Sequence, residues 1–340
     1  MNHPRFQLAA LPTPLQRAER LEHALDHPYP IFVKRDDLTG FGAAGNKARS
    51  LEFLLGDALD TGRDTLVTGG GPGSNYLAGA ALAARAAGLA CELIVPGDPA
   101  GSPNLELARR AGATIHPLGH HDRSRVDSAV VDLATRLATT GRQPYPAPRG
   151  GSTPVGALGF AHAATELSEQ LGGMAVEIVL AVGSGGSCAG LLAGIACHRL
   201  PWRVLAVSVS RPVPEIEAKV HRLAACCADL LGAPPPDPAA VRFVDGRGPG
   251  FGAASDVDRA AARLALETEG LLLDATYTAK ALAVLVAHEP GRPVVFWHTG
   301  GLVTAIAEYV TEGAVRERAC ERTMSQGGRE RQHGACEGLS

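Results

Sequence analysis

Two hydrophobic periodicities alternate along this chain. Short aliphatic or β-branched runs are separated by longer Ala- and Leu-rich stretches with helical spacing. This alternation is typical of βαβ units and of a largely parallel sheet, so we expect an α/β fold. The predicted strands are 31–35, 65–68, 91–96, 113–117, 176–182, 203–209, 241–244 and 293–297, and the predicted helices are 47–60, 75–88, 103–111, 125–139, 155–171, 188–199, 214–231, 255–269, 278–288 and 301–310.

Proline- and glycine-rich stretches mark the organisation of the chain. Residues 143–151 (QPYPAPRGG) predict a crossing between two sub-domains, and residues 234–238 predict a surface loop. Beyond about residue 320 the sequence is rich in Arg, Glu, Gln, Gly and Ser and has little to bury. We therefore expect a disordered tail over residues 316–340.

Composition narrows the class of protein. The chain has 340 residues, 45% hydrophobic and 20% charged, with a formal charge of −3, as in ordinary soluble globular proteins. It has no apolar run near the ~18 residues that span a bilayer and no secretory leader pattern at its start, so we expect a cytoplasmic protein without a membrane partner. Acidic and basic residues are mixed throughout, which argues against nucleic acid and favours a small-molecule partner.

Cysteine and lysine usage limits the chemistry further. The seven cysteines form no CxxC pair and no ladder, which argues against a disulfide framework and against a metal site. Of the 32 basic residues, 28 are arginine, because only Lys34, Lys47, Lys219 and Lys280 are lysine. Chemistry that needs an amine therefore has four candidates.

Lys47 has the most informative position of the four lysines. It follows Asn46, a favourable N-cap residue, and precedes Leu51 by four positions on the apolar stripe of helix 47–60. The helix dipole and burial both disfavour a positive charge there, so the amine pKa should fall, as a Schiff-base lysine requires. A lysine that extends to solvent from a frayed first turn is the alternative.

A glycine-rich turn follows the predicted strand 176–182. The run Gly183-Ser184-Gly185-Gly186-Ser187 opens a helix, where backbone N–H groups and the helix terminus can bind a phosphate. Cys188 stands where a dinucleotide fingerprint needs glycine, which disfavours that motif. A glycine turn without a ligand remains the alternative.

Two more strand ends carry polar residues and glycines. Residues 68–76 (TGGGPGSNY) place Ser74 and Asn75 at a helix start as expected caps, and residues 296–301 (FWHTGG) include His298. Loops at the carboxyl ends of strands line the ligand crevice of open α/β sheets. Ser74 can equally be only a cap, and His298 only a structural histidine.

Together these segments resemble the D-cysteine desulfhydrase and 1-aminocyclopropane-1-carboxylate deaminase family, which are pyridoxal-phosphate enzymes of the tryptophan synthase β-like fold (fold type II). The resemblance covers about residues 10–310. It is carried by residues 11–15 (LPTPL), 33–40 (VKRDDLTG), 45–55 (GNKARSLEFLL), 73–75 (GSN), 150–152 (GGS), 183–187, 248–252 (GPGFG), 273–280 (LDATYTAK) and 298–301 (HTGG).

The resemblance implies two open, twisted, mostly parallel sheets flanked by helices. We expect residues 1–46 and 150–315 to form a larger cofactor-binding domain and residues 47–149 a smaller α/β domain, in a homodimer. For the cofactor, the resemblance implies Lys47 as the Schiff-base lysine, Thr299 facing the pyridine nitrogen, Asn75 near the phenolic oxygen, and a phosphate site formed by Gly183, Ser184, Gly185, Gly186 and Ser187. It implies that the catalytic residues are Lys47, Ser74 and Tyr277. It implies that the residues in contact with the substrate are Ser74, Asn75, Tyr76, Phe251, Tyr277 and Thr278.

Departures from the family pattern concern the substrate. Tyr76 stands where the family carries histidine, and Phe251 where it carries a second active-site tyrosine. Thr278 resembles the desulfhydrase branch, whereas the cyclopropane deaminases have glutamate. The resemblance therefore implies α,β-elimination from a small amino acid, giving a keto acid and ammonia.

Other activities stay open from the sequence. With the same cofactor they are β-replacement, racemisation and cyclopropane amino acid deamination. Outside that chemistry they are a non-catalytic binding homologue and a serine hydrolase, since Gly185-Gly186-Ser187-Cys188-Ala189 is one residue short of a nucleophile elbow and His298 lies downstream.

Overall fold

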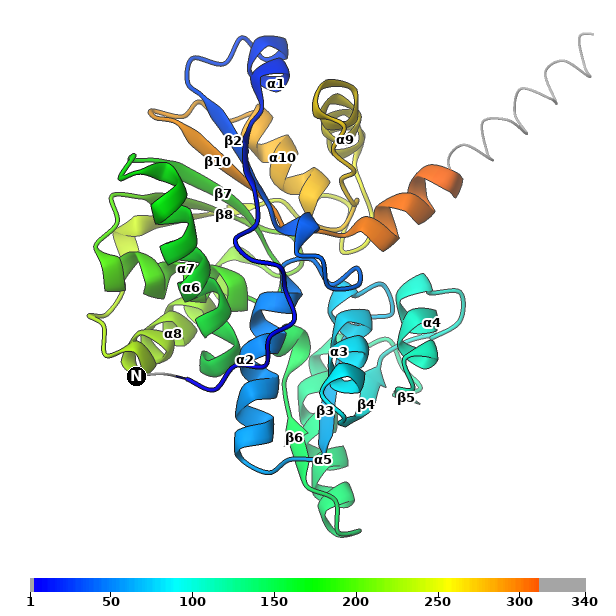
Figure 1. Cartoon of the computed structure of the whole chain (residues 1–340). Helices are drawn as coiled ribbons and strands as arrows, with labels where there is room; N and C mark the ends of the chain where they lie inside the picture. Colours follow the sequence, from blue (N-terminus) through cyan, green and yellow to red (C-terminus); the bar gives the residue numbers. More distant parts are fainter. Residues whose placement is uncertain (1–2, 312–340) are drawn as a thin grey trace, which may run out of the picture.

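The computed structural model describes residues 3–311. Two sheets organise them: a six-stranded sheet of order β1-β2-β10-β7-β8-β9 and a four-stranded sheet of order β5-β4-β3-β6 (Figure 1). All neighbouring strands are parallel except β1, which is antiparallel to β2. The predicted α/β fold with two mostly parallel sheets is confirmed.

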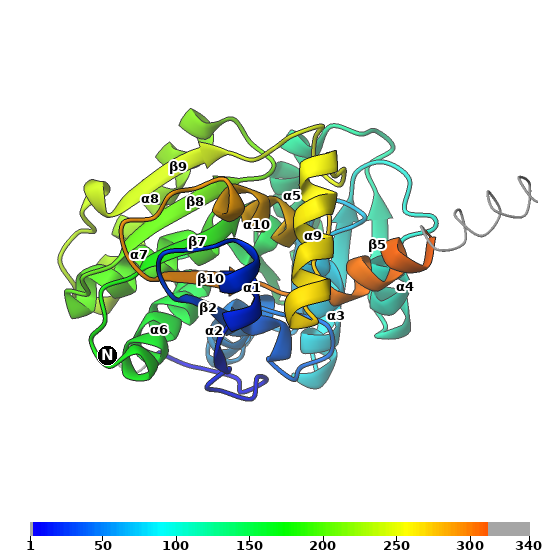
Figure 2. The same cartoon turned by 90° about the horizontal axis from the view of Figure 1, so that it is seen from above.

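The six-stranded sheet is covered by helices on both faces. Buried aliphatic residues of α6, α7 and α8 pack on one face, and those of α1, α9 and α10 pack on the other (Figure 2). Its central strands β10, β7 and β8 are almost fully buried and largely apolar, as is usual for parallel sheets. The six strands are β1 (Leu15–Arg17), β2 (Ile31–Arg35), β7 (Glu177–Val182), β8 (Arg203–Ser208), β9 (Val241–Asp245) and β10 (Val294–His298).

The four-stranded sheet comprises β3 (Thr65–Gly69), β4 (Ala90–Val95), β5 (Thr114–Pro117) and β6 (Pro144–Pro146). The sequence does not predict β6, because two of its three residues are prolines, and it predicts only a crossing there. Proline cannot donate a hydrogen bond to a neighbouring strand, but it is tolerated at the edge of a sheet, where β6 lies. Strand β1 was also missed, since it has only three residues and little apolar character.

The predicted helices are present, with ends that differ by a few residues. They are α2 (Lys47–Asp60), α3 (Asn75–Ala86), α4 (Pro103–Arg110), α5 (Val126–Ala138), α6 (Pro154–Leu171), α7 (Gly186–His198), α8 (Val213–Leu231), α9 (Asp256–Glu269) and α10 (Thr278–Val286). A last helix occupies residues 302–311. The hydrophobic pattern does not predict α1 (Glu19–Ala24), a short, mostly polar helix with one buried residue, Leu21.

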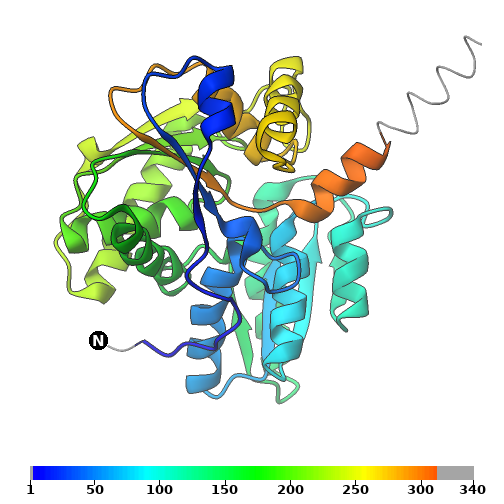
Figure 3. The ribbon, with the colours of Figure 1, turned by 45° about the horizontal axis from the view of Figure 1, so that its top comes forward.

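Helix α2 lies between the two sheets and packs on both sides. Its Leu51, Leu54 and Leu55 join the core around β3 and β4, whereas Phe53 packs with Ala157 and Leu158 of α6. The N-terminal segment runs along α2 before it reaches β1 (Figure 3), and the backbone N–H of Ala9 donates to Glu52 Oε1 at 2.7 Å. The division into residues 1–46 with 150–315 and residues 47–149 stays a prediction, and the predicted tail at 316–340 lies outside the described residues.

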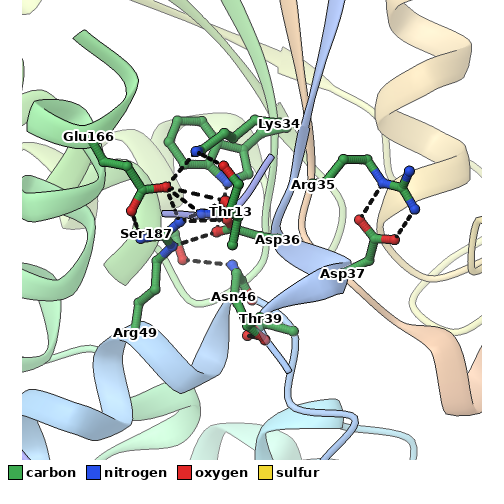
Figure 4. Close-up of polar contacts among 12 residues, drawn as sticks. Thr13, Lys34, Arg35, Asp36, Asp37, Thr39, Asn46, Arg49, Glu166 and Ser187 are labelled. Carbon is green, nitrogen blue, oxygen red and sulfur yellow. Dashed lines mark hydrogen bonds and ion pairs between the residues drawn. The ribbon is translucent and has the colours of Figure 1, made fainter. Parts of the chain in front are cut away.

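A buried ion cluster fastens the first turn of α2 to the six-stranded sheet. Arg49, only 1% exposed, donates to both carboxylate oxygens of Asp36 at 2.8 Å and to both of Glu166 at 2.9 Å (Figure 4). Lys34 donates to Glu166 and to the backbone oxygen of Thr13. The cluster therefore contains two cations and two carboxylates, and its charges balance.

The electrostatics of Glu166 follow from this arrangement. Burial opposes its ionisation, but the hydrogen bonds and charges of Arg49 and Lys34 lower its pKa to about 2. Trp297 of β10 completes the cluster by donating from Nε1 to Asp36 Oδ2 at 2.9 Å. The N-terminal segment, β2, α2, α6 and β10 thus meet at a single set of polar contacts.

Within residues 3–311 there is no helix with the length and apolar character needed to cross a membrane. The cysteines in this part of the chain, Cys91, Cys188, Cys197, Cys226 and Cys227, are free thiols.

The ion cluster gives a prediction for stability. Arg49→Met keeps most of the aliphatic side chain but leaves Asp36 and Glu166 with excess buried negative charge, which should lower the free energy of unfolding by about 3–5 kcal/mol. Arg110→Met is the control, because Arg110 is exposed and pairs with Glu106 on the surface of α4; we expect a change below about 1 kcal/mol. Denaturant unfolding measures both, and equal losses in the two variants would contradict the account.

Candidate active site

A cavity of about 280 Å³ lies between the two sheets. Its walls come from the start of α2 and from the loops that follow β3, β7 and β10, so it lies at the carboxyl ends of these parallel strands. The structure brings together at this cavity the following predicted site residues: Lys47, Ser74, Asn75, Tyr76, Gly183, Ser184, Gly185, Ser187, Phe251, Tyr277 and Thr299.

Lys47 is the first residue of α2 and is partly exposed to the cavity. Desolvation lowers the pKa of its amine to about 8, in the predicted direction. At neutral pH an appreciable fraction is then the free amine, which is the nucleophilic form. The other three lysines differ: Lys34 pairs with Glu166, Lys280 donates to the backbone oxygens of Arg247 and Gly250, and Lys219 does not line the cavity.

Asn46 occupies the N-cap position of α2 as predicted, but its side chain makes no capping hydrogen bond. Its side-chain Nδ2 donates to Ser187 Oγ at 3.1 Å (Figure 4). Its backbone N–H donates to the backbone oxygen of Thr299 at 2.9 Å. The residue before Lys47 therefore connects the loop after β7 with the loop after β10. Gly45 permits this approach, because a Cβ there would lie 2.5 Å from the Thr299 oxygen.

The glycine-rich loop after β7 leads directly into α7, which begins at Gly186, two residues before the predicted start. Gly185 has φ +98°, a conformation that favours glycine. Ser152 supports the loop: its hydroxyl donates to Ser184 Oγ at 2.7 Å and accepts from the backbone N–H of Gly186 at 3.2 Å. Gly186 thus faces Ser152 and does not line the cavity, whereas the rest of the predicted phosphate loop does.

The loop after β3 presents Ser74 at the start of α3. Ser74 occupies the N-cap position, but its side chain makes no capping hydrogen bond, so the expectation of a Ser74 side-chain cap is wrong. Asn75 is the first residue of α3, and its Oδ1 accepts hydrogen bonds from Asn104 at 3.2 Å and from Thr304 at 3.3 Å. Within residues 3–311 neither the amide nitrogen of Asn75 nor the hydroxyl of Ser74 has a hydrogen-bond partner, and both residues line the cavity.

Two of the predicted substrate contacts, Tyr76 and Thr278, are buried side chains. Tyr76 is 1% exposed, and its hydroxyl accepts from Thr68 Oγ1 at 3.3 Å. Thr278 is fully buried, does not line the cavity, and donates to Asp274 Oδ1 at 2.7 Å. Thr278 therefore holds Asp274 from behind the cavity wall and does not touch a substrate, in contrast to the prediction.

Asp274 orders the segment that presents Tyr277. Its carboxylate accepts backbone N–H groups of Thr276, Tyr277 and Thr278 at 3.0–3.1 Å. The Tyr277 ring lies against Gly183, where a Cβ would be 3.0 Å from ring atom Cε1, and edge-on to Phe251 at 5.8 Å. Burial raises the pKa of Tyr277, so at neutral pH its hydroxyl is protonated and can donate.

The serine hydrolase alternative fails on geometry. His298 Nδ1 accepts from the backbone N–H of Gly300 at 3.3 Å, and burial lowers the pKa of its ring to about 4. Ser187 Oγ accepts from Asn46, and within residues 3–311 no hydrogen bond joins Ser187 to His298. His298 is thus a buried histidine that makes no hydrogen bond to Ser187, so the pair lacks the contact that a nucleophile and its base require.

Several residues of the cavity wall were not predicted from the sequence, namely Asp274, Arg123, Arg149 and Arg211. Asp274 had a usable signal, because an aspartate in a turn commonly accepts the backbone N–H groups of the residues that follow it. No sequence signal distinguishes the three arginines of the cavity from the other arginines, since the chain has 28 of them. Only the fold brings Arg123, Arg149 and Arg211 to one cavity.

Known proteins with similar sequences belong to the class of enzyme that this site suggests. Residues 6–300 match the family model described as "Pyridoxal-phosphate dependent enzyme". A Pyrococcus abyssi protein named "Putative 1-aminocyclopropane-1-carboxylate deaminase" is 37% identical over 88% of this chain and 92% of the relative. A D-cysteine desulfhydrase of Klebsiella pneumoniae is 36% identical over 88% of this chain and 94% of the relative.

A solved structure supports the same family assignment. The crystal structure of an ACC deaminase homologue superposes with a TM-score of 0.84 and 32% identity, covering 89% of this chain and 93% of the other. The family predicted from the sequence is thereby confirmed, and so is its cofactor, pyridoxal phosphate. This chain belongs to the family of pyridoxal-phosphate dependent enzymes.

Proposed function

We propose that this enzyme is a lyase that removes a β-substituent and ammonia from a small amino acid, in the manner of a D-cysteine desulfhydrase. The observation that carries the proposal is the placement of Lys47: an amine with a pKa of about 8 shares one cavity with a glycine-rich loop at a helix N-terminus and with the hydroxyls of Ser74 and Tyr277. The names of the relatives support the substrate class.

The cavity wall fits the cofactor. An amine that is partly unprotonated at neutral pH suits a covalent bond to the cofactor aldehyde. The loop at residues 183–187 offers backbone donors at the N-terminus of α7, with Ser184 and Ser187 as side-chain donors to a phosphate. Thr299 brings a neutral hydroxyl to the wall, which suits a pyridine nitrogen without a proton. Asn75 is proposed to contact the phenolic oxygen.

Within this arrangement the residues of the chain have distinct roles. When bound, pyridoxal phosphate withdraws electrons from the substrate α-carbon and so favours loss of a proton there. Lys47 is the proposed base for that proton, since its lowered pKa suits proton transfer near neutral pH. Ser74 is proposed to bind the substrate carboxylate beside the first N–H groups of α3.

Tyr277 is the proposed acid at the β-substituent. Its hydroxyl is protonated at neutral pH, because burial raises its pKa, and its ring is held between Gly183 and Phe251. Donating a proton makes the departing group neutral and easier to expel. The balanced reaction consumes one water and converts the amino acid to a keto acid, ammonia and the protonated leaving group.

The competing activities of this family differ at the β-carbon. In β-replacement a second nucleophile adds there, in racemisation no substituent leaves, and a cyclopropane substrate opens its ring. Phe251 stands where the family resemblance implies a tyrosine, and it packs against Tyr277 without adding a hydroxyl. The cavity therefore has one hydroxyl fewer beside Tyr277 for chemistry at the β-carbon. A cytoplasmic homodimer remains part of the proposal.

Product analysis tests the proposed reaction. Incubated with D- and L-cysteine and with D- and L-β-chloroalanine, the purified enzyme should form pyruvate and ammonia in equal amounts from at least one of them. Lys47→Arg is the control, since it keeps the positive charge and loses the reactive amine. Inversion of configuration without pyruvate would contradict the proposal, as would 2-oxobutanoate formed only from 1-aminocyclopropane-1-carboxylate.

The phosphate loop gives a prediction for cofactor binding. Gly185→Asp puts a negative charge beside the proposed phosphate and should weaken cofactor binding well beyond Gly185→Ala, which imposes the same backbone strain without charge. The dissociation constant of pyridoxal phosphate, measured by titration of each cofactor-free variant, should differ between them by roughly tenfold or more. Equal constants would place the phosphate away from this loop.

Tyr277 gives a prediction for catalysis. Tyr277→Phe should lower kcat by ~10²–10⁴, the usual contribution of a positioned acid, while the protein retains its cofactor. The change in cavity shape is small, so binding of the substrate should be preserved. Steady-state kinetics and cofactor content measure both effects, and full activity in the variant would remove Tyr277 from proton transfer.

A further inference from the structure

Arg123 is a charged residue of the cavity that the proposed mechanism does not use. It begins a short 3-10 helix, η2 (Arg123–Arg125), and lines the cavity near the loop that carries Ser74, because a Cβ on Gly71 would lie 3.6 Å from its Nε. Its guanidinium carbon lies 3.8 Å from the centre of the Phe251 ring. Arg123 is therefore held at the same end of the cavity as the proposed substrate-facing residues.

Among residues 3–311 the guanidinium of Arg123 has no anionic partner. The Nε atom is buried and makes no hydrogen bond, and within residues 3–311 the side chain forms no ion pair. Burial, together with the charges of Arg149 and Arg211, lowers the pKa of Arg123, yet an arginine stays protonated. A partly buried cation of this kind is unfavourable unless a ligand completes its hydrogen bonds.

The other arginines of the cavity are already paired. Arg149 pairs with Asp127 at 2.9 Å, and Arg211 pairs with Glu215. Both are next to the phosphate loop: Gly150 abuts Ser184, and the Ser210 hydroxyl donates to the Gly183 oxygen at 3.2 Å. Among the cations that line the cavity in the described part of the chain, Arg123 and Lys47 have no carboxylate partner, and Lys47 is assigned to the cofactor.

The α-carboxylate of a substrate has other donors. Ser74 keeps its hydroxyl free of a capping bond, and the first N–H groups of α3 lie at the same loop. Phe251 meanwhile presents its ring to the guanidinium, a cation–π contact that fixes the side chain without neutralising it. The arrangement leaves a preformed cation for an anion other than the α-carboxylate.

We propose that Arg123 binds a second anionic group of the substrate, so that this enzyme prefers small amino acids whose side chain ends in a carboxylate, a sulfonate or a similar anion. The inference rests on the proposed function, because it takes an amino acid as the substrate. It makes Arg123 a determinant of specificity and gives Phe251 the role of holding it.

Binding of aspartate and asparagine to the cofactor-loaded enzyme tests this, since the two are nearly equal in shape and differ in side-chain charge. Isothermal titration calorimetry with both enantiomers of each should show the better aspartate enantiomer binding about 10- to 100-fold more tightly than the corresponding asparagine. Arg123→Gln should abolish this preference. Arg125→Gln, at an exposed position of the same short helix, should preserve it.

Each other outcome overturns the inference. If the unaltered enzyme shows no preference for aspartate, or no measurable aspartate binding, then Arg123 does not bind a second anionic group of the substrate. Equal weakening of aspartate, asparagine and alanine by Arg123→Gln would assign Arg123 to the α-carboxylate, and loss of cofactor on dialysis would assign it to the phosphate. Because the test measures binding, a charge preference without pyruvate formation would refute the proposed reaction and leave the role of Arg123 standing.

Discussion

The buried pairing of Arg49 with Asp36 and Glu166 is the interaction on which the site depends. Arg49 lies two residues after Lys47 in the first turn of α2, and its guanidinium is shared between η1 (Asp36–Leu38) and α6. Because these carboxylates belong to the elements around the six-stranded sheet, the pairing fixes the start of α2 against that sheet. Lys47 is thereby held at the boundary between the two sheets, where the cavity lies.

Close backbone approaches complete the wall around Lys47. A Cβ on Gly300 would lie 2.9 Å from the Gly45 Cα, and one on Gly150 would lie 2.2 Å from Ser184 Oγ. The loop before α2 therefore packs directly on the loop after β10, and the segment at residue 150 packs directly on the phosphate loop. Residues that are distant in sequence are brought into one site by contacts that tolerate no side chain at these glycines.

Most of the fold could be predicted from the hydrophobic pattern, because buried parallel strands and amphipathic helices have strong periodicities. Strand β6 and helix α1 could not, since prolines and polar residues gave them no such signal. Among the site residues, those in glycine-rich strand-end loops were recognisable from local sequence. The contacts of Asn46 with Ser187 and of Arg123 with Phe251 join residues far apart in the chain, and local patterns do not contain that information.

The central claim is that Lys47, placed by Arg49 at the junction of the sheets, holds the cofactor. Borohydride reduction of the cofactor-loaded enzyme makes the bond between lysine and cofactor permanent, and peptide mapping by mass spectrometry then locates it. The account predicts a pyridoxyl group on Lys47 in the native protein and none in Lys47→Arg. A pyridoxyl group on Lys34, Lys219 or Lys280 of the native protein would contradict it.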